Sequence, residues 1–340
     1  MANRTRVFLL VAAGILAAGL GTGFLAWYLG VPALAALGSD APQELGYIPD
    51  NARLVAYADV REVMNSSLHD RLRQLQQGSP SNTDGLEART GVNIETDIDR
   101  VVAAMSGQDT AGMDRPLLVA RGRFNEVKIE GLMRDQGAQV QQYLGTRLIF
   151  IKTDSHDAAV AFAETGLILF GDGTAVRRAI DTKAGAAPNI TDNREFMSQV
   201  RDVDDGAAWT VAKFDALASR TPLPAEIANQ LPPINWLAAS GRVDGDVRGL
   251  VRAETRDEAS AQNLRDVVRG LLALAKIQGA QRPELNGMLN SVQLGGEGKT
   301  VSLSFEVTPG VLDFLGSGGA VRRGPGPRRP IQPQAPPPIY

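Results

Sequence analysis

A glycine turn carries the most suggestive chemistry in this sequence. Gly171, Asp172, Gly173 and Thr174 follow an apolar strand-like run and precede a segment with helical spacing. Backbone amides at such a helix N-terminus can bind phosphate, which makes Gly171, Gly173 and Thr174 a candidate anion-binding turn. The dinucleotide fingerprint is broken at Val176, where its third glycine belongs, and Asp172 would repel an anion. The alternative is a tight turn in which Asp172 or Thr174 caps the helix.

Catalytic combinations are sparse. Ser155, His156 and Asp157 are the residue types of a hydrolase triad, but three neighbours in one loop cannot face one another as nucleophile, base and orienting acid. The only other histidine, His69, is far from His156 in the sequence, so the two do not indicate a shared metal ion. The chain has no cysteine, which excludes thiolate chemistry and disulfides. We therefore predict no catalytic residue, no metal ligand and no cofactor.

Two acidic turns could attract a cation. Asp202, Asp204 and Asp205 form one of them, and an Asp-Gly-Asp sequence at 244–246 forms the other. Neither has the twelve-residue ligand spacing, ending in Glu, that is typical of calcium loops. A solvated loop explains the first turn and a hairpin turn explains the second.

The C-terminal residues Gly316–Tyr340 are rich in Pro and Gly and contain four Arg and no acidic residue. This composition cannot bury a core and predicts a disordered tail, partly in the polyproline II conformation. The arginines could contact anionic surfaces such as lipid headgroups. The candidate tail interaction residues are Arg322, Arg323, Arg328 and Arg329.

The N-terminal region contains an uncharged apolar segment, Val7–Gly30. Its 24 residues would extend about 36 Å as a helix, enough to cross a bilayer core of about 30 Å. Arg4 and Arg6 precede it, whereas the first charges after it are Asp40 and Glu44. The positive-inside rule therefore predicts a single-pass anchor with its N-terminus in the cytoplasm and the remaining chain outside, on the periplasmic or extracellular face.

A cleavable signal peptide is the alternative for this segment, since Ala33-Leu34-Ala35 fits a cleavage site. The apolar run is much longer than the roughly 7–15 residues of a signal-peptide core, which favours the anchor. The spacing of Gly19 and Gly23 is also compatible with a helix-dimer face.

The formal net charge of −3 is an average over unlike parts. Six of the 35 basic residues are the arginines of the two ends, which leaves 29 basic residues against 38 acidic ones, a net charge of −9, between them. An acidic body argues against nucleic acid as a partner.

The region between the ends alternates strand-like runs with fewer helices. Tight turns join several runs, notably Glu164-Thr165-Gly166, and these predict antiparallel hairpins. The predicted strands are Leu54–Asp59, Val101–Met105, Leu117–Gly122, Leu148–Lys152, Ala158–Ala163, Leu167–Gly171, Ala208–Lys213, Leu237–Val243, Val247–Glu254, Val292–Leu294 and Val301–Val307.

Helix starts are indicated by acidic spacing at Asp59-x-x-Glu62 and Asp192-x-x-Glu195. The clearest start is Thr255-x-x-Glu258, read as a capping box before a long apolar-periodic segment. The apolar residues of that segment that can share one face are Leu264, Val267, Val268, Leu271, Leu272 and Ala275.

We therefore predict an α+β fold with antiparallel sheets, hairpins and helices packed on one face. A polar turn, a buried strand, an Asp and a helix occur near residue 50 and again about 155 residues later, which suggests two related halves. The predicted organisation is a cytoplasmic N-terminus 1–6, an anchor 7–30, a linker 31–46, α+β modules 47–187 and 188–315, and the tail 316–340.

Several stretches resemble a loose class of bacterial single-pass envelope proteins with duplicated α+β ectodomains. These are IPDNARLVAYADV, TGVNIETDIDRVVAAM, AVAFAETGLILFGDGTAVRRAID and the pair VRAETRDEASAQNLRDVVRGLLAL and TVSLSFEV. The resemblance is at the level of the fold and implies no catalytic residues.

The expected function is that of a membrane-anchored, extracytoplasmic, non-enzymatic scaffold or protein-binding module of the cell envelope. Its expected partners are the membrane, through the N-terminal helix, and an envelope protein or a second copy of the chain. Two alternatives stay open. One is an envelope hydrolase with an Asp/Glu-based site, and the other is a carrier that holds an apolar ligand in an open cavity between sheet and helices.

Overall fold

The computed structural model describes most of the region between the two ends of the chain. The described residues are 42–66, 69, 91–106, 115–152, 157–218, 230–243, 247–279, 283–307 and 311. The predicted anchor, the arginine tail, the turn at 244–246, Ser155 and His156 lie outside them. In this described part, no helix is both long enough and apolar enough to cross a membrane.

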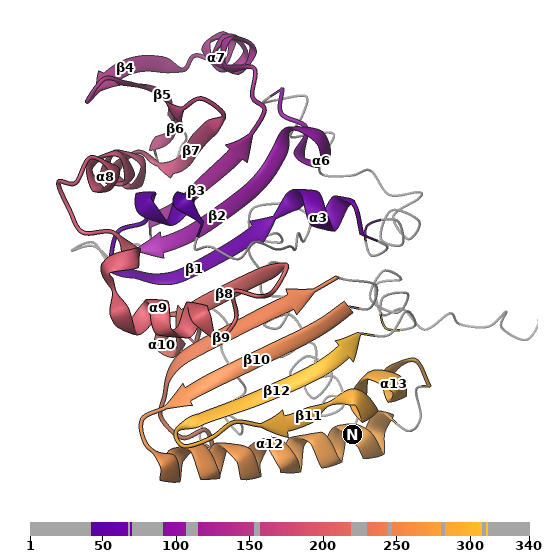
Figure 1. Ribbon diagram of the computed structural model, residues 1–340. Helices are drawn as coiled ribbons and strands as arrows, with labels where there is room; N and C mark the ends of the chain where they lie inside the picture. The colour runs from indigo at the N-terminus through magenta and orange to yellow at the C-terminus, as the bar shows by residue number, and fades with distance from the viewer. Residues whose placement is uncertain are drawn as a thin grey trace, which may run out of the picture.

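A single antiparallel sheet of 12 strands organises the described residues (Figure 1). The strand order across the sheet is β11-β12-β10-β9-β8-β1-β2-β3-β7-β6-β5-β4. The strands are β1 (Ala52–Asp59), β2 (Ile98–Ser106), β3 (Arg115–Gly122), β4 (Gln139–Tyr143), β5 (Thr146–Lys152), β6 (Asp157–Glu164), β7 (Leu167–Asp172), β8 (Ala208–Lys213), β9 (Ile234–Arg242), β10 (Val247–Thr255), β11 (Gln293–Gly295) and β12 (Thr300–Val307).

The sequence predicted eleven of these strands within a few residues, together with three hairpins, which the structure confirms as β6–β7, β9–β10 and β11–β12. Strand β4 was not predicted. Its sequence QVQQY is polar except for Val140 and Tyr143. Strand β4 lies at one edge of the sheet, where fewer side chains are buried, so it needs few apolar residues and gives a weak sequence signal. The turn to β5 at Leu144 and Gly145 has positive φ at both residues, which fits a two-residue hairpin.

Helices connect the strands and cover the sheet. They are the 3-10 helices η1 (Gln43–Tyr47) and η2 (Ile190–Asp192) and the α-helices α3 (Val60–Met64), α6 (Ile94–Asp97), α7 (Glu126–Asp135), α8 (Gly173–Lys183), α9 (Arg194–Arg201), α10 (Phe214–Ala218), α12 (Glu258–Gly279) and α13 (Pro283–Ser291). Asp59 caps α3 as predicted. Asn193 caps α9 and is adjacent to the predicted Asp192. The predicted capping box at Thr255 was wrong, because Asp257, two residues later, accepts from the Ser260 amide at the start of α12, whereas the Thr255 hydroxyl donates to the Asp257 backbone oxygen.

The prediction that helices pack on one face was wrong, because helices cover both faces of the sheet. Adjacent residues of a strand point to opposite faces, yet Leu148 and Ile149 of β5 are both fully buried. Leu148 shares a core cluster with Val176 of α8, whereas Ile149 shares another with Met133 of α7. A strand that is apolar on both sides needs cover on both sides.

The two halves of the chain meet at the antiparallel pair β1–β8, close to the middle of the sheet. Val55 lies opposite Val211, and Tyr57 lies opposite Trp209, with ring centroids 5.6 Å apart in a stacked arrangement. Phe196 of α9 is fully buried in the same core cluster. The two halves of the chain therefore share one core, although their central strands are about 155 residues apart in the sequence.

Strand order repeats on the two sides of this central pair. From the centre outward, one side reads β1, β2, β3, β7, β6 and the other reads β8, β9, β10, β12, β11. In each half, the third strand pairs with the last strand, β3 with β7 and β10 with β12. The last strand also forms a hairpin with the strand before it, so β6 and β11 lie one position farther from the centre. The N-terminal half carries the additional strands β5 and β4 beyond this pattern.

The folded region begins earlier than the sequence indicated. Helix η1 lies within the segment expected to be linker, and Leu45 is fully buried in the main core cluster. Glu44 is also buried, with 1% of its side chain exposed. The end of the predicted linker is therefore packed against the sheet.

Candidate interaction surface

The glycine turn at the start of α8 is a capped helix N-terminus. The Asp172 carboxylate accepts hydrogen bonds from the amides of Thr174, at 2.9 Å, and Ala175, at 3.3 Å. It also forms an ion pair with Arg115 at 2.7 Å. The amides that a phosphate would need are thus bound to a carboxylate of the chain itself, and a Cβ on Gly173 would lie 2.9 Å from the Phe150 ring. The geometry favours capping over anion binding.

The Asp172 cap predicts a pH-dependent contribution to stability. Burial raises the pKa of Asp172, but the hydrogen bonds from Arg115 and from the two amides outweigh it and hold the pKa below its usual value. A lowered folded-state pKa means that the stabilisation is present above about pH 3.9, the ordinary Asp value, and is lost as the pH falls through the lower folded pKa.

Asp172→Asn is therefore expected to reduce the free energy of unfolding by about 1 kcal/mol at pH 7 and by less at an acidic pH near the lowered folded-state pKa of Asp172, where part of the carboxylate is protonated. Urea unfolding at the two pH values measures this, with Asp266→Asn, in an exposed ion pair, as the control. An equal loss at both pH values would show that the carboxylate charge makes no contribution.

The acidic turn after α9 is bound to arginines. Asp202 pairs with Arg252 at 2.7 Å, and Asp205 pairs with Arg242. His69 lies 3.7 Å from a carboxylate oxygen of Glu95. Among the residues that the structure describes, no group of three or more His, Asp or Glu is placed to hold a metal ion.

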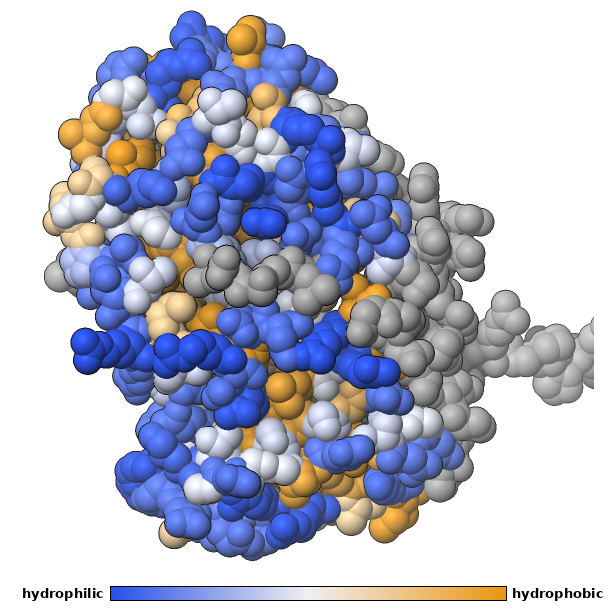
Figure 2. Space-filling view, in the orientation of Figure 1, coloured by the Kyte–Doolittle hydropathy of each residue, from blue (hydrophilic) through white to orange (hydrophobic). Residues whose placement is uncertain are grey.

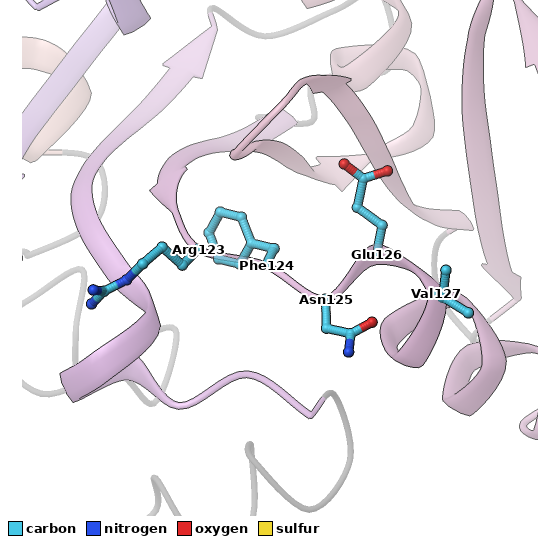
Figure 3. A pocket seen from close by; sticks show the side chains of 5 residues that line it. All are labelled: Arg123, Phe124, Asn125, Glu126 and Val127. Carbon is cyan, nitrogen blue, oxygen red and sulfur yellow. The ribbon is translucent and has the colours of Figure 1, made fainter.

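A surface hollow of about 620 Å³ lies at the start of α7, lined by residues 123–127 (Figure 3). The side chains of Arg123, Asn125 and Glu126 point in different directions around it instead of converging. Asn125 caps α7 by accepting from the Lys128 amide at 3.0 Å, and Arg123 donates to the backbone oxygen of Thr96. These polar groups already have structural partners, so the hollow is not a prepared ligand site.

A connected group of charged side chains surrounds η1. The buried Glu44 accepts from Arg121 of β3, and Arg121 also lies 3.6 Å from Glu164 at the end of β6. The Tyr47 hydroxyl donates to Glu164 at 2.7 Å, and the Lys183 ammonium of α8 approaches the same carboxylate at 3.2 Å. This set, the η1 charge network, connects the N-terminal end of the fold to three elements of the first half.

Electrostatics in the η1 charge network favour fixed charges over proton transfer. The hydrogen bond from Tyr47, with further help from Lys183, lowers the pKa of Glu164 although burial opposes this. Burial and the bond to Glu164 raise the pKa of Tyr47. Burial lowers the pKa of Arg121, but the hydrogen bond to Glu44 outweighs it and the net pKa is raised. A general acid would need a carboxyl with a raised pKa, so the network is suited to holding η1 in place.

Helix α12 carries two of the five large apolar side chains that are exposed among the described residues. Its inner side is packed on the sheet through Ala261 and Leu264, which are buried with Val301 of β12. On its outer side, Leu274 is 45% exposed and Ile277 is 70% exposed. In the orientation of Figure 1, hydrophobic surface gathers at the lower right of Figure 2, where the C-terminal half of α12 lies.

These exposed residues belong to a regular stripe. Val267, Gly270, Leu274 and Ile277 recur at intervals of three or four residues, which places them along one side of the helix. Val267 is half-buried, and nothing lies within 4 Å of the position where a Cβ on Gly270 would stand. We name these four residues the outer stripe of α12. A solvent-facing helix side normally carries polar residues, so the apolar stripe is a candidate interaction surface.

The fold and this surface define an α+β protein with one antiparallel sheet and an exposed apolar helix face. No family model matches the chain, and no curated protein matches it. Among solved structures, the chain is similar to crystal form III of TP0453, with 11% identity, a TM-score of 0.47 and coverage of 82% of this chain and 99% of that one. Crystal form IV of TP0453 gives 12% identity, a TM-score of 0.46 and coverage of 82% and 96%. The similarity is remote and carries no functional inference.

Sequence reasoning found only part of the outer stripe. It placed Val267 on the packed face of the helix and did not select Leu274 or Ile277. The signal was present, because the apolar residues of the segment LLALAKI cover more of the helix circumference than one packed face can bury.

Proposed function

We propose that the protein is a membrane-anchored, extracytoplasmic module of the cell envelope that binds another protein chain and catalyses no reaction. The observation that carries the binding role is the outer stripe of α12, where Leu274 and Ile277 are exposed on a long helix. The compartment and the anchor rest on the sequence, through the apolar segment Val7–Gly30 and the charges around it.

The enzyme alternative has less support in the described residues. Glu44 and Glu164 both contact Arg121, and the pKa of Glu164 is lowered, which does not suit a general acid. Burial raises the pKa of Asp59, but this carboxylate is occupied as the cap of α3 and pairs with Arg100. These groups explain local structure and do not form a site with a paired acid and base.

The carrier alternative predicts an open apolar cavity between the sheet and its helices. Where α9 covers the sheet, Phe196 and Trp236 fill the space, with their rings 6.2 Å apart in an edge-on arrangement. The hollow beside α7 is lined by polar as well as apolar side chains. Neither place favours a carrier of apolar ligands.

We also propose that the two halves of the sheet arose by duplication. Support comes from the repeated strand order on either side of β1–β8 and from the sequence echo near residues 50 and 205. Helices in equivalent chain positions agree with this, since α7 follows β3 and α12 follows β10. The second half can then have specialised α12 for binding, because this helix is 22 residues long and α7 only 10.

A photo-cross-linking residue in place of Ile277 tests the binding role. Irradiation of cells that produce the full-length chain is expected to give protein adducts, because a partner that covers the outer stripe must contact this position. The same residue in place of Arg269, which is exposed on another side of α12, is the matched control, and Leu274→Asp should remove the adducts.

Absence of any protein adduct at position 277 would refute the binding role.

The compartment is tested separately with the variant Gln142→Cys, which carries the only thiol of the chain at an exposed position. A membrane-impermeant maleimide should label it in intact cells once the outer barrier is opened. Labelling only after lysis of the inner membrane would refute the proposed topology.

A further inference from the structure

We propose that the outer stripe of α12 binds the same stripe on a second copy of this chain, with the two helices antiparallel. This inference rests on the proposed function and names its partner. The evidence is the order of large and small residues and of charges along α12. When a second α12 is laid antiparallel on the first, small residues face large ones and the acidic half faces the basic half. A two-fold symmetric contact requires this property of a surface, because the same patch must serve both sides.

Size complementarity fixes the register of the two helices. If Gly270 of one copy lies opposite Leu274 of the other, then Val267 lies opposite Ile277, and each of these contacts occurs twice. The space beside Gly270 is open within 4 Å of a Cβ position, so it can receive the large Leu274 side chain. A small residue opposite a large one lets two helices approach closely and bury both.

Charge complementarity favours the antiparallel direction. The first half of α12 and the two residues before it carry Asp257, Glu258 and Asp266 together with Arg256 and Arg265, a net charge of −1. The second half carries Arg269 and Lys276 and no acidic residue, a net charge of +2. The antiparallel helix dipoles also attract.

The contact is small, and this agrees with a protein anchored in a membrane. The outer stripe spans about three helical turns and buries less area than the 1,200–2,000 Å² of standard stable interfaces. Two chains confined to one membrane have a high effective concentration, so a weak contact suffices.

Disulfide cross-linking tests the register, and the chain is suited to it because it has no cysteine. The variant Val267→Cys with Ile277→Cys places each thiol opposite the other in the proposed pair. The two positions are about 15 Å apart within one helix, too far for a bond within the chain, so oxidation of the full-length protein can link only two copies.

The expected result is a covalent dimer on a non-reducing gel, reduced at least tenfold when Leu274→Asp is added. The control variant Glu258→Cys with Arg269→Cys has nearly the same spacing and two exposed positions on another side of α12, and it should remain monomeric. Equal cross-linking of both variants would indicate random collision and overturn the proposal, as would no cross-linking of the first.

Lipid is the competing occupant of this face. An environment-sensitive fluorophore at Ile277→Cys should shift to the blue as the protein concentration rises and should not respond to vesicles of neutral and anionic phospholipid. The reverse response would assign the outer stripe to a bilayer and overturn the dimer. Photo-adducts at position 277 that contain only other proteins would also overturn it, while leaving the proposed binding function intact.

Discussion

Arg121→Leu is expected to lower the free energy of unfolding by about 3–5 kcal/mol, the largest effect of any single charge removal in the described residues. Arg121 is the partner of Glu44, whose side chain is 1% exposed. Within the described residues, the second carboxylate oxygen of Glu44 has no hydrogen-bond partner. Removal of the guanidinium would leave a buried negative charge without compensation, and the fold must then expose η1 or protonate Glu44.

The double variant Glu44→Leu with Arg121→Leu should recover most of this loss, since apolar residues of similar volume often replace a buried ion pair at little cost. Arg269→Leu is the matched control, because its ion pair with Asp266 is more than half exposed and should contribute less than about 1 kcal/mol. Urea unfolding followed by circular dichroism measures all three variants. If Arg121→Leu costs no more than Arg269→Leu, the η1 charge network does not hold the N-terminal end of the fold.

Phe196→Ala is expected to cost about 3–5 kcal/mol, for a different reason. Phe196 is fully buried on α9, where it contacts Trp236 of β9 near the centre of the sheet. Truncation would leave a cavity between α9 and the strands that join the two halves. The indole of Trp236 also donates to Glu195 at 2.6 Å, so movement of α9 would disturb a second contact.

Phe170→Ala is the matched control, since the same side chain is 40% exposed on β7 and its loss should cost about 1 kcal/mol or less. Thermal and urea unfolding of both variants give the comparison. Tryptophan fluorescence, to which Trp209 and Trp236 of this core contribute, should change in Phe196→Ala and stay unchanged in Phe170→Ala. Similar costs at the two positions would mean that α9 is not part of the central core.

The strands were predictable from the sequence because most of them are apolar and are bounded by glycine or acidic turns. Strand β8, Ala208–Lys213, was predicted with the correct bounds. Strand β4 was missed because an edge strand with QVQQY has no apolar alternation. Helix α7 was missed for a related reason, since EVKIEGLMRD combines Gly131 with many charges and is recognisable mainly from its cap, Asn125.

The arrangement of these elements was harder to predict than their existence. The sequence suggested two modules, and the chain forms one continuous sheet because β1 pairs with β8. It suggested helices on one face, although Leu148 and Ile149 are adjacent and both buried. The candidate interaction surface depended on which side of α12 contacts the sheet. Local spacing placed Leu264, which is buried, on the packed face and left out Leu274, which is exposed, but it did not show that the exposed residues form a stripe with Val267.

The pairing of β1 with β8 has a consequence for the order of folding. A nascent chain emerges from its N-terminus, so β1 and β2 are available long before residues 208–213 have been made. Until then, β1, which carries Val55 and Tyr57, can pair with β2 but not with β8. The N-terminal half therefore lacks the partner strand β8 until the second half has been synthesised. Contacts between residues so distant in the chain also form slowly. Completion of this fold is thus timed by synthesis of the second half.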